Sequence, residues 1–432
     1  MAERLTPTAA AERVQPRDVL GLPLGPGQPP AFLHALGERD DFDELVVHSA
    51  LLIDLYALFT RHGVKLRSGF FGPAERFLRE AGHDVEFVPA DFRRFSLIAE
   101  RVAPRVVATA ASAPDSDGYL SLALHAGATV NELHRAGRDP ERVLVVEANR
   151  RLPRTFGLPP ELPHTIHIDE IDILIEVEEE PFVLADSAPT DTDRAIAEHA
   201  RAYIHDGCTI QTGIGGIPSR IATLLAEGPG GDYGIHSEMF TTGLMHLHEA
   251  GKVTNQKGVF DGFSVATFAA GTLELYDWLD GNDAVRFLPV DEVNTPSMIA
   301  ANRDMVTING AVLVDLEGQV AADSMGDRQY SGIGGHEDFV AVSGFQLSDR
   351  SLVCLPSAST VEGVVLPRIV DRFPPGTAVT TPRHHVDVVV TEWGSAELAG
   401  LTVRERALAL VELAHPDFRD ELRDAAHRIA TR

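Results

Sequence analysis

The chain has 432 residues, of which 44% are hydrophobic and 23% are charged, and its formal net charge is −27. This composition is typical of a globular protein, and the length predicts two domains or one large α/β unit. The acidic charge argues against nucleic-acid binding, which needs a basic face, and equally against anionic membranes.

No apolar run approaches the roughly 18 residues that a membrane-spanning helix needs. The N-terminal segment 1–14 lacks the apolar stretch of a secretory signal. The two cysteines, Cys208 and Cys354, lie in apolar strand-like runs, which is typical of core thiols in a reducing compartment. We therefore expect a cytoplasmic protein without nucleic-acid or membrane partners.

Strand-like runs alternate with helical patterns along the chain, which predicts α/β architecture with mainly parallel sheets. The segment 306–320 predicts a hairpin with Glu317–Gly318 in the turn. A capping box at Thr402 and Glu405 predicts a helix through 413, and a last amphipathic helix follows. The predicted strands are 45–48, 105–110, 142–146, 208–212, 286–290, 351–355 and 386–391.

The segment 176–193 is acidic and interrupted by prolines, which is typical of a linker between domains. We therefore place the domain boundary there and expect an N-terminal domain over 1–185 and a C-terminal domain over 186–432.

A weak internal repeat also favours two halves. Stretches that begin at Asp18 and at Asp206 each predict a strand, a glycine-rich turn, a proline and an apolar helix. In both stretches the first turn glycine, Gly25 or Gly213, stands seven positions after the aspartate. This spacing predicts a duplication.

The second of these units, 208–228, is the more distinct. It predicts a strand, a turn GIGG at 213–216, Pro218 at the first helical position and Gly228 at the helix end. Backbone N–H groups at such a helix start suit a phosphate or an oxyanion, although a tight turn alone would need the same glycines. The GxGxxG pattern is broken here, because no glycine follows Gly215 at the required spacing, and a dinucleotide site is disfavoured.

Glu238 follows a predicted short strand at 233–236 and so lies at the carboxyl end of a sheet, where α/β proteins bind ligands. A glutamate is ordinarily a solvated surface charge, but His236, Met239 and Phe240 make this neighbourhood unusually apolar. The chain has no GxSxG, HExxH, CxxC or GxxxxGK[ST] motif, which disfavours a serine hydrolase, a metal site and P-loop chemistry. A second glycine turn occupies 331–335, and no helix is predicted after it.

Longer motifs resemble the acetyl-CoA hydrolase/transferase family, which includes the 4-hydroxybutyrate and succinyl-CoA:acetate CoA-transferases. The matching motifs run nearly end to end and are long enough to make chance a poor explanation. They are DSDGYLSLA (115–123), EANRRLPRTFG (147–157), GIGGIP (213–218), GIHSEM (234–239), SGIGGHEDF (331–339), TTPR…VVTEWG (380–394) and RERA…AHPDFRDEL (404–422).

The resemblance implies a fold of two similar open α/β domains (CoA-transferase, NagB/RpiA-like) with the active site between them. It implies that Glu238 is the nucleophile and that the backbone N–H groups of Ile214 and Gly335 form an oxyanion hole. It further implies coenzyme A or acyl-CoA as a substrate, no permanently bound cofactor, no metal, and a homodimer or larger even oligomer. The residues that it assigns to coenzyme A are Gly213, Ile214, Gly215, Gly216, Ile217, Ser331, Gly334 and Gly335.

The sequence departs from the family pattern at three places: 241–243, His336 and 357–363. We expect these departures to affect the choice of substrate more than the chemistry. The preferred interpretation is a CoA-transferase that works through a glutamyl-CoA thioester. An acyl-CoA hydrolase and a non-catalytic acyl-CoA sensor are the alternatives. Because no arginine or lysine flanks Glu238 closely, short monocarboxylates are the predicted acceptors.

Overall fold

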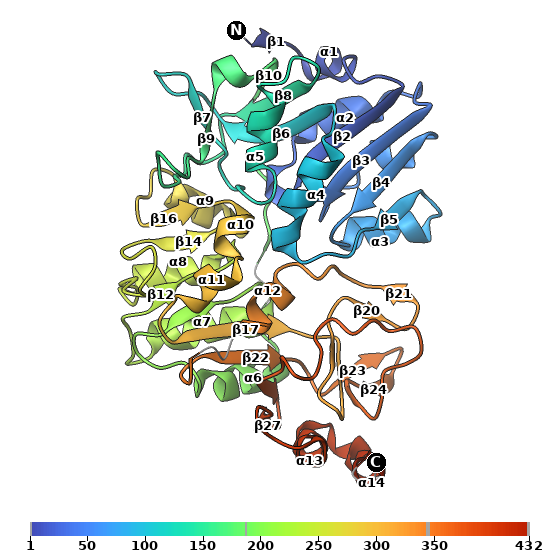
Figure 1. Ribbon diagram of the computed structural model, residues 1–432, viewed down its shortest axis with the longest axis vertical. Coiled ribbons are helices and arrows are strands. Elements are labelled where there is room, and N and C mark those ends of the chain that lie inside the picture. Colours follow the sequence, from blue (N-terminus) through green and yellow to red (C-terminus); the bar gives the residue numbers. More distant parts are fainter. Residues whose placement is uncertain (1, 186–187, 343–345, 430–432) are drawn as a thin grey trace. The chain divides into compact units, whose positions relative to one another are not determined.

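The computed structural model describes residues 2–185, 188–342 and 346–429, and the chain forms two compact units (Figure 1). The first unit comprises Met1–Leu184 and Val265–Val293, and the second comprises Ala185–Ser264 and Asn294–Arg432. The expected boundary at 185/186 adjoins residues 186–187, which lie outside the described residues, and the linear division stays a prediction. By its contacts, Val265–Val293 belongs to the first unit.

The first unit contains an eight-stranded sheet in the order β1-β10-β8-β6-β2-β3-β4-β5, and all neighbouring strands are parallel. Its inner strands are continuous apolar runs because both faces of a parallel sheet are covered. The predicted α/β fold is therefore confirmed. The strands are β1 Glu3–Arg4, β2 Arg17–Leu24, β3 Glu44–Ala50, β4 Val64–Ser68, β5 Val85–Phe87, β6 Val106–Ser112, β8 Val143–Asn149 and β10 Ile173–Val177.

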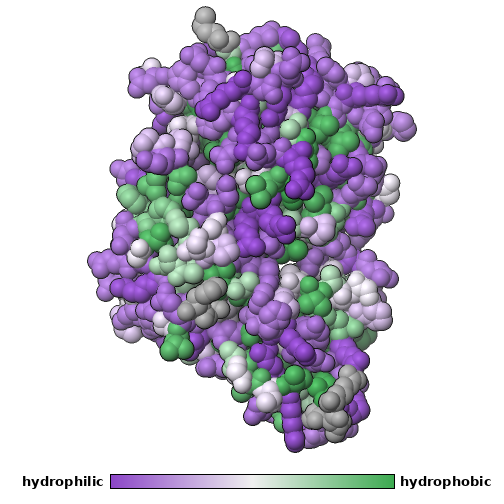
Figure 2. Space-filling view, in the orientation of Figure 1, coloured by the Kyte–Doolittle hydropathy of each residue, from purple (hydrophilic) through white to green (hydrophobic). Residues whose placement is uncertain are grey.

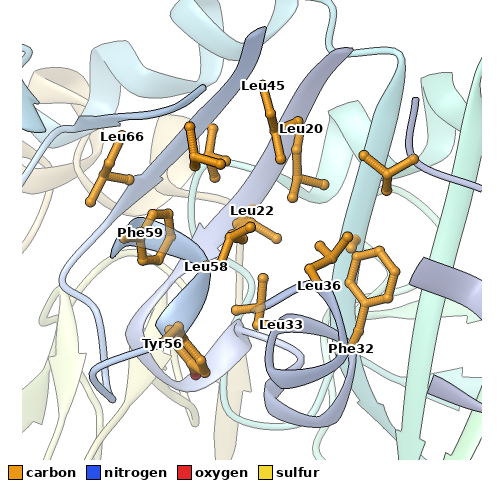
Figure 3. Close-up of a cluster of buried hydrophobic side chains, with 14 of the residues drawn as sticks. Leu20, Leu22, Phe32, Leu33, Leu36, Leu45, Tyr56, Leu58, Phe59 and Leu66 are labelled. Atoms are coloured by element: carbon orange, nitrogen blue, oxygen red, sulfur yellow. The ribbon is translucent and has the colours of Figure 1, made fainter. Parts of the chain in front are cut away.

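A core of buried leucines and aromatic residues joins α2 and η2 to strands β2, β3 and β4 (Figure 3). Helices α4 and α5 lie in front of the sheet in Figure 1. The remaining elements of this unit are α1 Pro7–Ala11, η1 Gly25–Gly27, α2 Pro30–Gly37, η2 Ala57–Thr60, α3 Pro73–Glu80, η3 Phe92–Arg94, α4 Phe95–Val102, β7 Tyr119–Ser121, α5 Val130–Ala136, β9 Thr165–His167, η4 Ile168–Glu170, β15 Phe268–Ala269, α9 Leu273–Leu279, β16 Val285–Phe287 and α10 Val290–Val293, with β14 Ser264–Ala266 at its border.

The second unit contains a six-stranded sheet in the order β12-β11-β17-β22-β26-β27, parallel except for the edge pair β26–β27. Its strands are β11 Thr209–Gln211, β12 Gly234–Ile235, β17 Met305–Gly310, β22 Arg350–Cys354, β26 Val388–Thr391 and β27 Gly394–Glu397. Smaller strands are β13 Met239–Phe240, β18 Leu313–Asp315, β19 Val320–Ala321, β20 Ser324–Met325, β21 Arg328–Gln329, β23 Ala358–Val361, β24 Val364–Pro367 and β25 Ile369–Val370.

The hairpin predicted over 306–320 is right in its turn and wrong in its first half. Strands β18 and β19 are antiparallel around Glu317–Gly318, and Gly318 has a φ of 86°. The preceding β17 instead pairs in parallel with β11 and β22 inside the sheet. An apolar run of this kind suits a buried parallel strand as well as a hairpin arm, so its pattern alone does not distinguish the two.

The helices of the second unit correct two predictions. Helix α7 begins at Gly216, so Pro218 is its third residue, and α12 follows the 331–335 turn where no helix was expected. Pro218 is tolerated there because first-turn N–H groups have no intrahelical partner. The capping box of Thr402 and Glu405 is confirmed. The helices are α6 Asp191–Arg201, α7 Gly216–Glu227, α8 Thr242–Glu249, α11 Pro296–Ala300, α12 His336–Val340, α13 Val403–Leu413, η5 Pro416–Phe418 and α14 Arg419–Ile429.

Hydrophilic side chains predominate on the face drawn in Figure 2, as the acidic composition leads one to expect. Among the residues that the structure describes, no helix has both the length and the apolar character needed to cross a membrane.

A fully buried lysine, Lys257, closes the loop between α8 and β14. The Nζ atom of Lys257 donates to the carbonyl oxygens of Val259, Phe260 and Phe263 at 2.7, 2.7 and 2.8 Å. Burial lowers the pKa of Lys257 to about 8. One side chain thus gathers three carbonyls of this loop, of which the Phe260 oxygen also accepts from the Phe263 N–H at 3.2 Å.

We expect Lys257→Met to destabilise the protein by about 2–4 kcal/mol, because three carbonyl groups lose a charged donor inside the protein. Urea unfolding at pH 7 measures this change. The control is Lys65→Met, since Lys65 makes partly exposed ion pairs with Asp84 and Glu86 and its loss should cost much less. Equal losses in the two variants would contradict the prediction.

Candidate active site

Two chain segments leave the second sheet side by side at its carboxyl edge. Strands β11 and β12 are parallel neighbours, with Thr209 opposite Gly234 and Ile210 opposite Ile235. Just beyond them, the Ser237 hydroxyl donates to the carbonyl of Thr212 at 2.9 Å. The Thr212 N–H in turn donates to Oγ of Ser237 at 3.4 Å. This pair fixes the residue before Glu238 against the residue before the GIGG turn.

The carboxyl group of Glu238 is partly buried and receives a side-chain donor that the sequence did not reveal. The Nδ2 atom of Asn294 lies 2.7 Å from Glu238 Oε2. The same nitrogen lies 3.0 Å from Oδ2 of Asp338, which is on α12. Asn294 and Asp338 are both completely buried, so one amide group is held between two carboxyl groups.

Gly335 lies directly against this arrangement. A Cβ atom at this position would stand 1.9 Å from Glu238 Oε2 and 2.7 Å from Asn294 Nδ2. A side chain at position 335 would displace the Glu238 carboxyl group or the Asn294 amide group, so glycine is needed to keep this arrangement in place. Gly335 is also the residue from which α12 starts.

The environment of Glu238 changes its acidity. Burial raises the pKa of the carboxyl group from 4.5 to about 8. The hydrogen bond from Asn294 opposes this rise, and the charge of Asp338 adds to it. A glutamate whose pKa is raised in this way is a strong candidate for a functional group.

The GIGG turn differs from the 331–335 turn in that it is open. Gly213 and Gly215 have no atoms within 4 Å of where a Cβ would be, and Gly215 has a φ of 112°. Ile214 is 48% exposed. The described contacts bring Gly335, but not Ile214, to the carboxyl group of Glu238.

The corresponding turn of the first unit is already filled. Gln28 is buried, and its Nε2 atom donates to Ser49 Oγ and to the carbonyl of Ala50, each at 3.2 Å. At the start of α2, the N–H of Phe32 donates to Oε2 of Glu147 at 2.9 Å. A carboxylate of the chain thus takes the place at this helix N-terminus where an external anion could bind.

His336, one of the positions where the sequence departs from the family pattern, is directed into the protein. Its Nε2 atom lies 2.9 Å from Thr381 Oγ1, and burial lowers its pKa to about 4. The Thr381 hydroxyl in turn donates to Glu337 at 2.7 Å, and Nδ1 of His385 lies 2.7 Å from the same carboxyl group. His336 is therefore a neutral residue of an internal network that lies behind Gly335.

Sequence reasoning missed Asn294 and Asp338. Asn294 follows α10 in a segment without a motif, and nothing in its neighbours indicates that it meets Glu238. Asp338 was inside the quoted SGIGGHEDF motif without a role of its own. Asp338 lies one turn of α12 after Gly335. Because no helix was predicted there, the sequence did not indicate that the two residues are close in space.

An open parallel sheet with a buried, weakly acidic glutamate and glycine turns at its carboxyl edge defines an α/β protein with an enzyme-like site. Comparisons with known proteins agree with this class. The family model described as acetyl-CoA hydrolase/transferase C-terminal domain matches residues 271–426. The chain is 35% identical over 429 residues to a succinyl-CoA:cyclohexane-1-carboxylate CoA transferase of Geobacter metallireducens, covering 98% of this chain and 95% of that protein.

It is also 35% identical over 408 residues to a 4-hydroxybutyrate coenzyme A transferase of Clostridium kluyveri, covering 90% of this chain and 92% of the relative. The crystal structure of RipA from Yersinia pestis superimposes with a TM-score of 0.89 at 33% identity, covering 99% of this chain and 98% of that one. The chain belongs to the acetyl-CoA hydrolase/transferase family and is an enzyme of that family. Enzymes of this family use CoA thioesters as substrates.

The raised pKa of Glu238 has a consequence for stability. The folded protein holds this proton more tightly than the unfolded chain, so the contribution of Glu238 is most favourable below pH 4.5 and is lost as the pH rises through about 8. We expect the melting temperature of the wild type to fall relative to that of Glu238→Gln between about pH 5 and pH 9. Thermal unfolding across this range tests it, with Glu249→Gln at the exposed end of α8 as the control. A difference in melting temperature between the wild type and Glu238→Gln that stays constant with pH would contradict the prediction.

Proposed function

We propose that the enzyme is a CoA-transferase in which Glu238 is the covalent nucleophile. The observation that carries this proposal is the partly buried carboxyl group of Glu238, which has Asn294 Nδ2 at 2.7 Å and a glycine with no room for a side chain beside it. A carboxylate that is poorly solvated is more basic and a better nucleophile than one in water.

In the proposed reaction, a Glu238 oxygen attacks the carbonyl carbon of an acyl-CoA, and the C–S bond breaks. The products are a mixed anhydride and CoA thiolate. The thiolate then attacks the glutamyl carbonyl and displaces the first carboxylate, which leaves a glutamyl-CoA thioester. An acceptor carboxylate reverses both steps. Each intermediate is activated, so the thioester bond is conserved without a nucleotide.

Each addition places negative charge on a carbonyl oxygen, so positioned donors stabilise it. We assign the backbone N–H groups of Ile214 and Gly335 to this task, and we add the Asn294 amide because it already donates to the Glu238 carboxyl group. Loss of one such donor typically slows a reaction by about 100–1000-fold. Gly213–Ile217 and Ser331–Gly335 are proposed to hold coenzyme A.

Two further proposals follow from the sequence. The first and second halves of the chain act as paired CoA-transferase domains, and the second carries the nucleophile. The enzyme is a cytoplasmic homodimer or larger even oligomer. The buried free thiols Cys208 and Cys354 support a reducing compartment, and burial raises the pKa of each to about 12.

Mixing the enzyme with acetyl-CoA in the absence of acceptor should attach CoA to Glu238, with a mass increase of CoA less one water on the peptide that contains residues 234–239. Glu238→Ala should form no adduct and exchange no CoA. Glu238→Asp should also be poor, since its carboxyl group is withdrawn by about 1 Å. Intact-mass and peptide mass spectrometry provide the measurement.

Glu249→Ala, which removes an exposed glutamate of α8, is the matched control and should keep normal exchange and adduct formation. Near-normal exchange by Glu238→Ala, or an adduct on another peptide, would exclude the mechanism. CoA release without any new thioester, in the presence of carboxylates, would instead identify a hydrolase.

We propose short monocarboxylates such as acetate, propionate and butyrate as acceptors. The residues 234–243 contain no arginine or lysine that could pair with a second carboxylate, and Asp338 adds negative charge beside Glu238. The value of kcat/KM for acetate should exceed that for succinate in an exchange assay with one common acyl-CoA donor. A higher value for succinate would refute this acceptor class.

A further inference from the structure

We propose that Asp338 is a positioning residue, which holds the Asn294 side chain with its N–H2 group directed at the Glu238 carboxyl group. This inference rests on the proposed role of Glu238 as the nucleophile. It gives α12 a second contribution to the site, because Gly335 and Asp338 are brought to the same carboxyl group from the start and from the first turn of one helix.

The contacts of Asn294 are confined to one end of its amide group. Its Nδ2 atom lies 2.7 Å from Glu238 Oε2 and 3.0 Å from Asp338 Oδ2. These two contacts use both hydrogens of the nitrogen. The Oδ1 atom of Asn294 is buried and has no hydrogen-bond partner among the described residues. The two hydrogen bonds of Nδ2 therefore fix the orientation of the amide group.

An asparagine amide can rotate by half a turn and exchange its nitrogen and oxygen with little change in shape. In the rotated form, Oδ1 of Asn294 would face Glu238, and it could neither donate to the carboxylate nor stabilise charge on the glutamyl oxygen. An ionised carboxylate accepts hydrogen bonds and donates none. Asp338 therefore favours the orientation that supplies N–H groups, whereas an amide at position 338 would tolerate both.

Burial makes this arrangement costly, which favours a functional explanation. A carboxylate removed from water is strongly disfavoured unless donors compensate it, yet Asp338 is completely buried. Its charge also opposes the ionised form of Glu238 and so adds to the rise of that pKa. During the proposed cycle Glu238 changes from an anion to a neutral thioester, and a fixed negative neighbour favours that change.

Among the described residues, two side chains shift the pKa of Glu238. The hydrogen bond from Asn294 lowers it, and the charge of Asp338 raises it. The nearest titratable residue along the chain, His236, packs its ring edge-on against Phe339 with centroids 6.4 Å apart. The ionisation of Glu238 is thus an appropriate reporter of a change at position 338.

A double-mutant cycle tests whether Asp338 acts through Asn294. We expect Asp338→Asn and Asn294→Ala each to lower kcat/KM for CoA exchange by about 10–100-fold. The double variant should lie within about threefold of Asn294→Ala, because no amide remains for Asp338 to orient. Losses that multiply in the double variant would overturn the proposal. If Asp338→Asn does not fold, Asp338→Ser replaces it in the same cycle, and the same two outcomes decide.

The matched control is Asp349→Asn. Asp349 is equally buried and accepts from the N–H groups of Met305 and Gln346 at 3.1 and 3.0 Å. It contributes to stability without contact to Glu238. Its effect on kcat/KM, if any, should multiply with that of Asn294→Ala, as expected of independent sites.

The pH profile supplies a readout that a purely structural role would not change. In the Asn294→Ala background, Asp338→Asn should move the acid limb of kcat/KM to lower pH, because only a negative charge beside Glu238 is removed. With Asn294 present the move should be smaller, because the rotated amide no longer donates to Glu238 and this loss raises the pKa. In Asp349→Asn the limb should not move. Equal moves of the limb in the two backgrounds would overturn the proposal. Wild-type protein that forms no adduct on Glu238 refutes the nucleophile itself, whereas an intact adduct with multiplying losses refutes only the role of Asp338.

Discussion

One amide group shared between two carboxyl groups is the contact on which the candidate site depends. The nitrogen of Asn294 lies between Glu238 and Asp338, and without it two neighbouring acids, one partly and one fully buried, would lose the donor that they share. Such an arrangement is electrostatically unfavourable, and burial converts that cost into a weakly acidic Glu238. The free-energy cost of burial therefore appears as a carboxyl group that holds its proton more tightly than one in water.

The parallel sheet supplies the geometry that this contact needs. Strands β11 and β12 end together, and the Ser237–Thr212 pair fixes the chain at the point where both leave the sheet. Helix α12 begins on the same side of the unit, and its N-cap residue, Gly335, can lie against Glu238 because it carries no side chain. The ends of β11 and β12 and the glycine N-cap of α12 thus define the position of the Glu238 side chain.

The two glycine turns, one in each half of the chain, have different surroundings. In the first unit Gln28 and Glu147 fill the space at the turn and at the start of α2. Burial raises the pKa of Glu147 to about 7, as expected for a carboxyl group enclosed by protein. In the second unit the GIGG turn is open and Ile214 is half exposed, so only this turn is free to receive a ligand. The two turns therefore differ in whether side chains of the protein already occupy them.

The sequence by itself determined the α/β class, most of the strands, the helix of the second glycine unit and the position of Glu238 after a short strand. These features are local, since apolar runs, glycine turns and capping residues act on near neighbours. It did not predict α12, the parallel pairing of β17, or the meeting of Glu238 with Asn294 and Asp338. Those three side chains are separated by 56 and 44 positions. Only the tertiary structure brings them together, because contacts between such distant segments depend on strand order and not on the residues beside them.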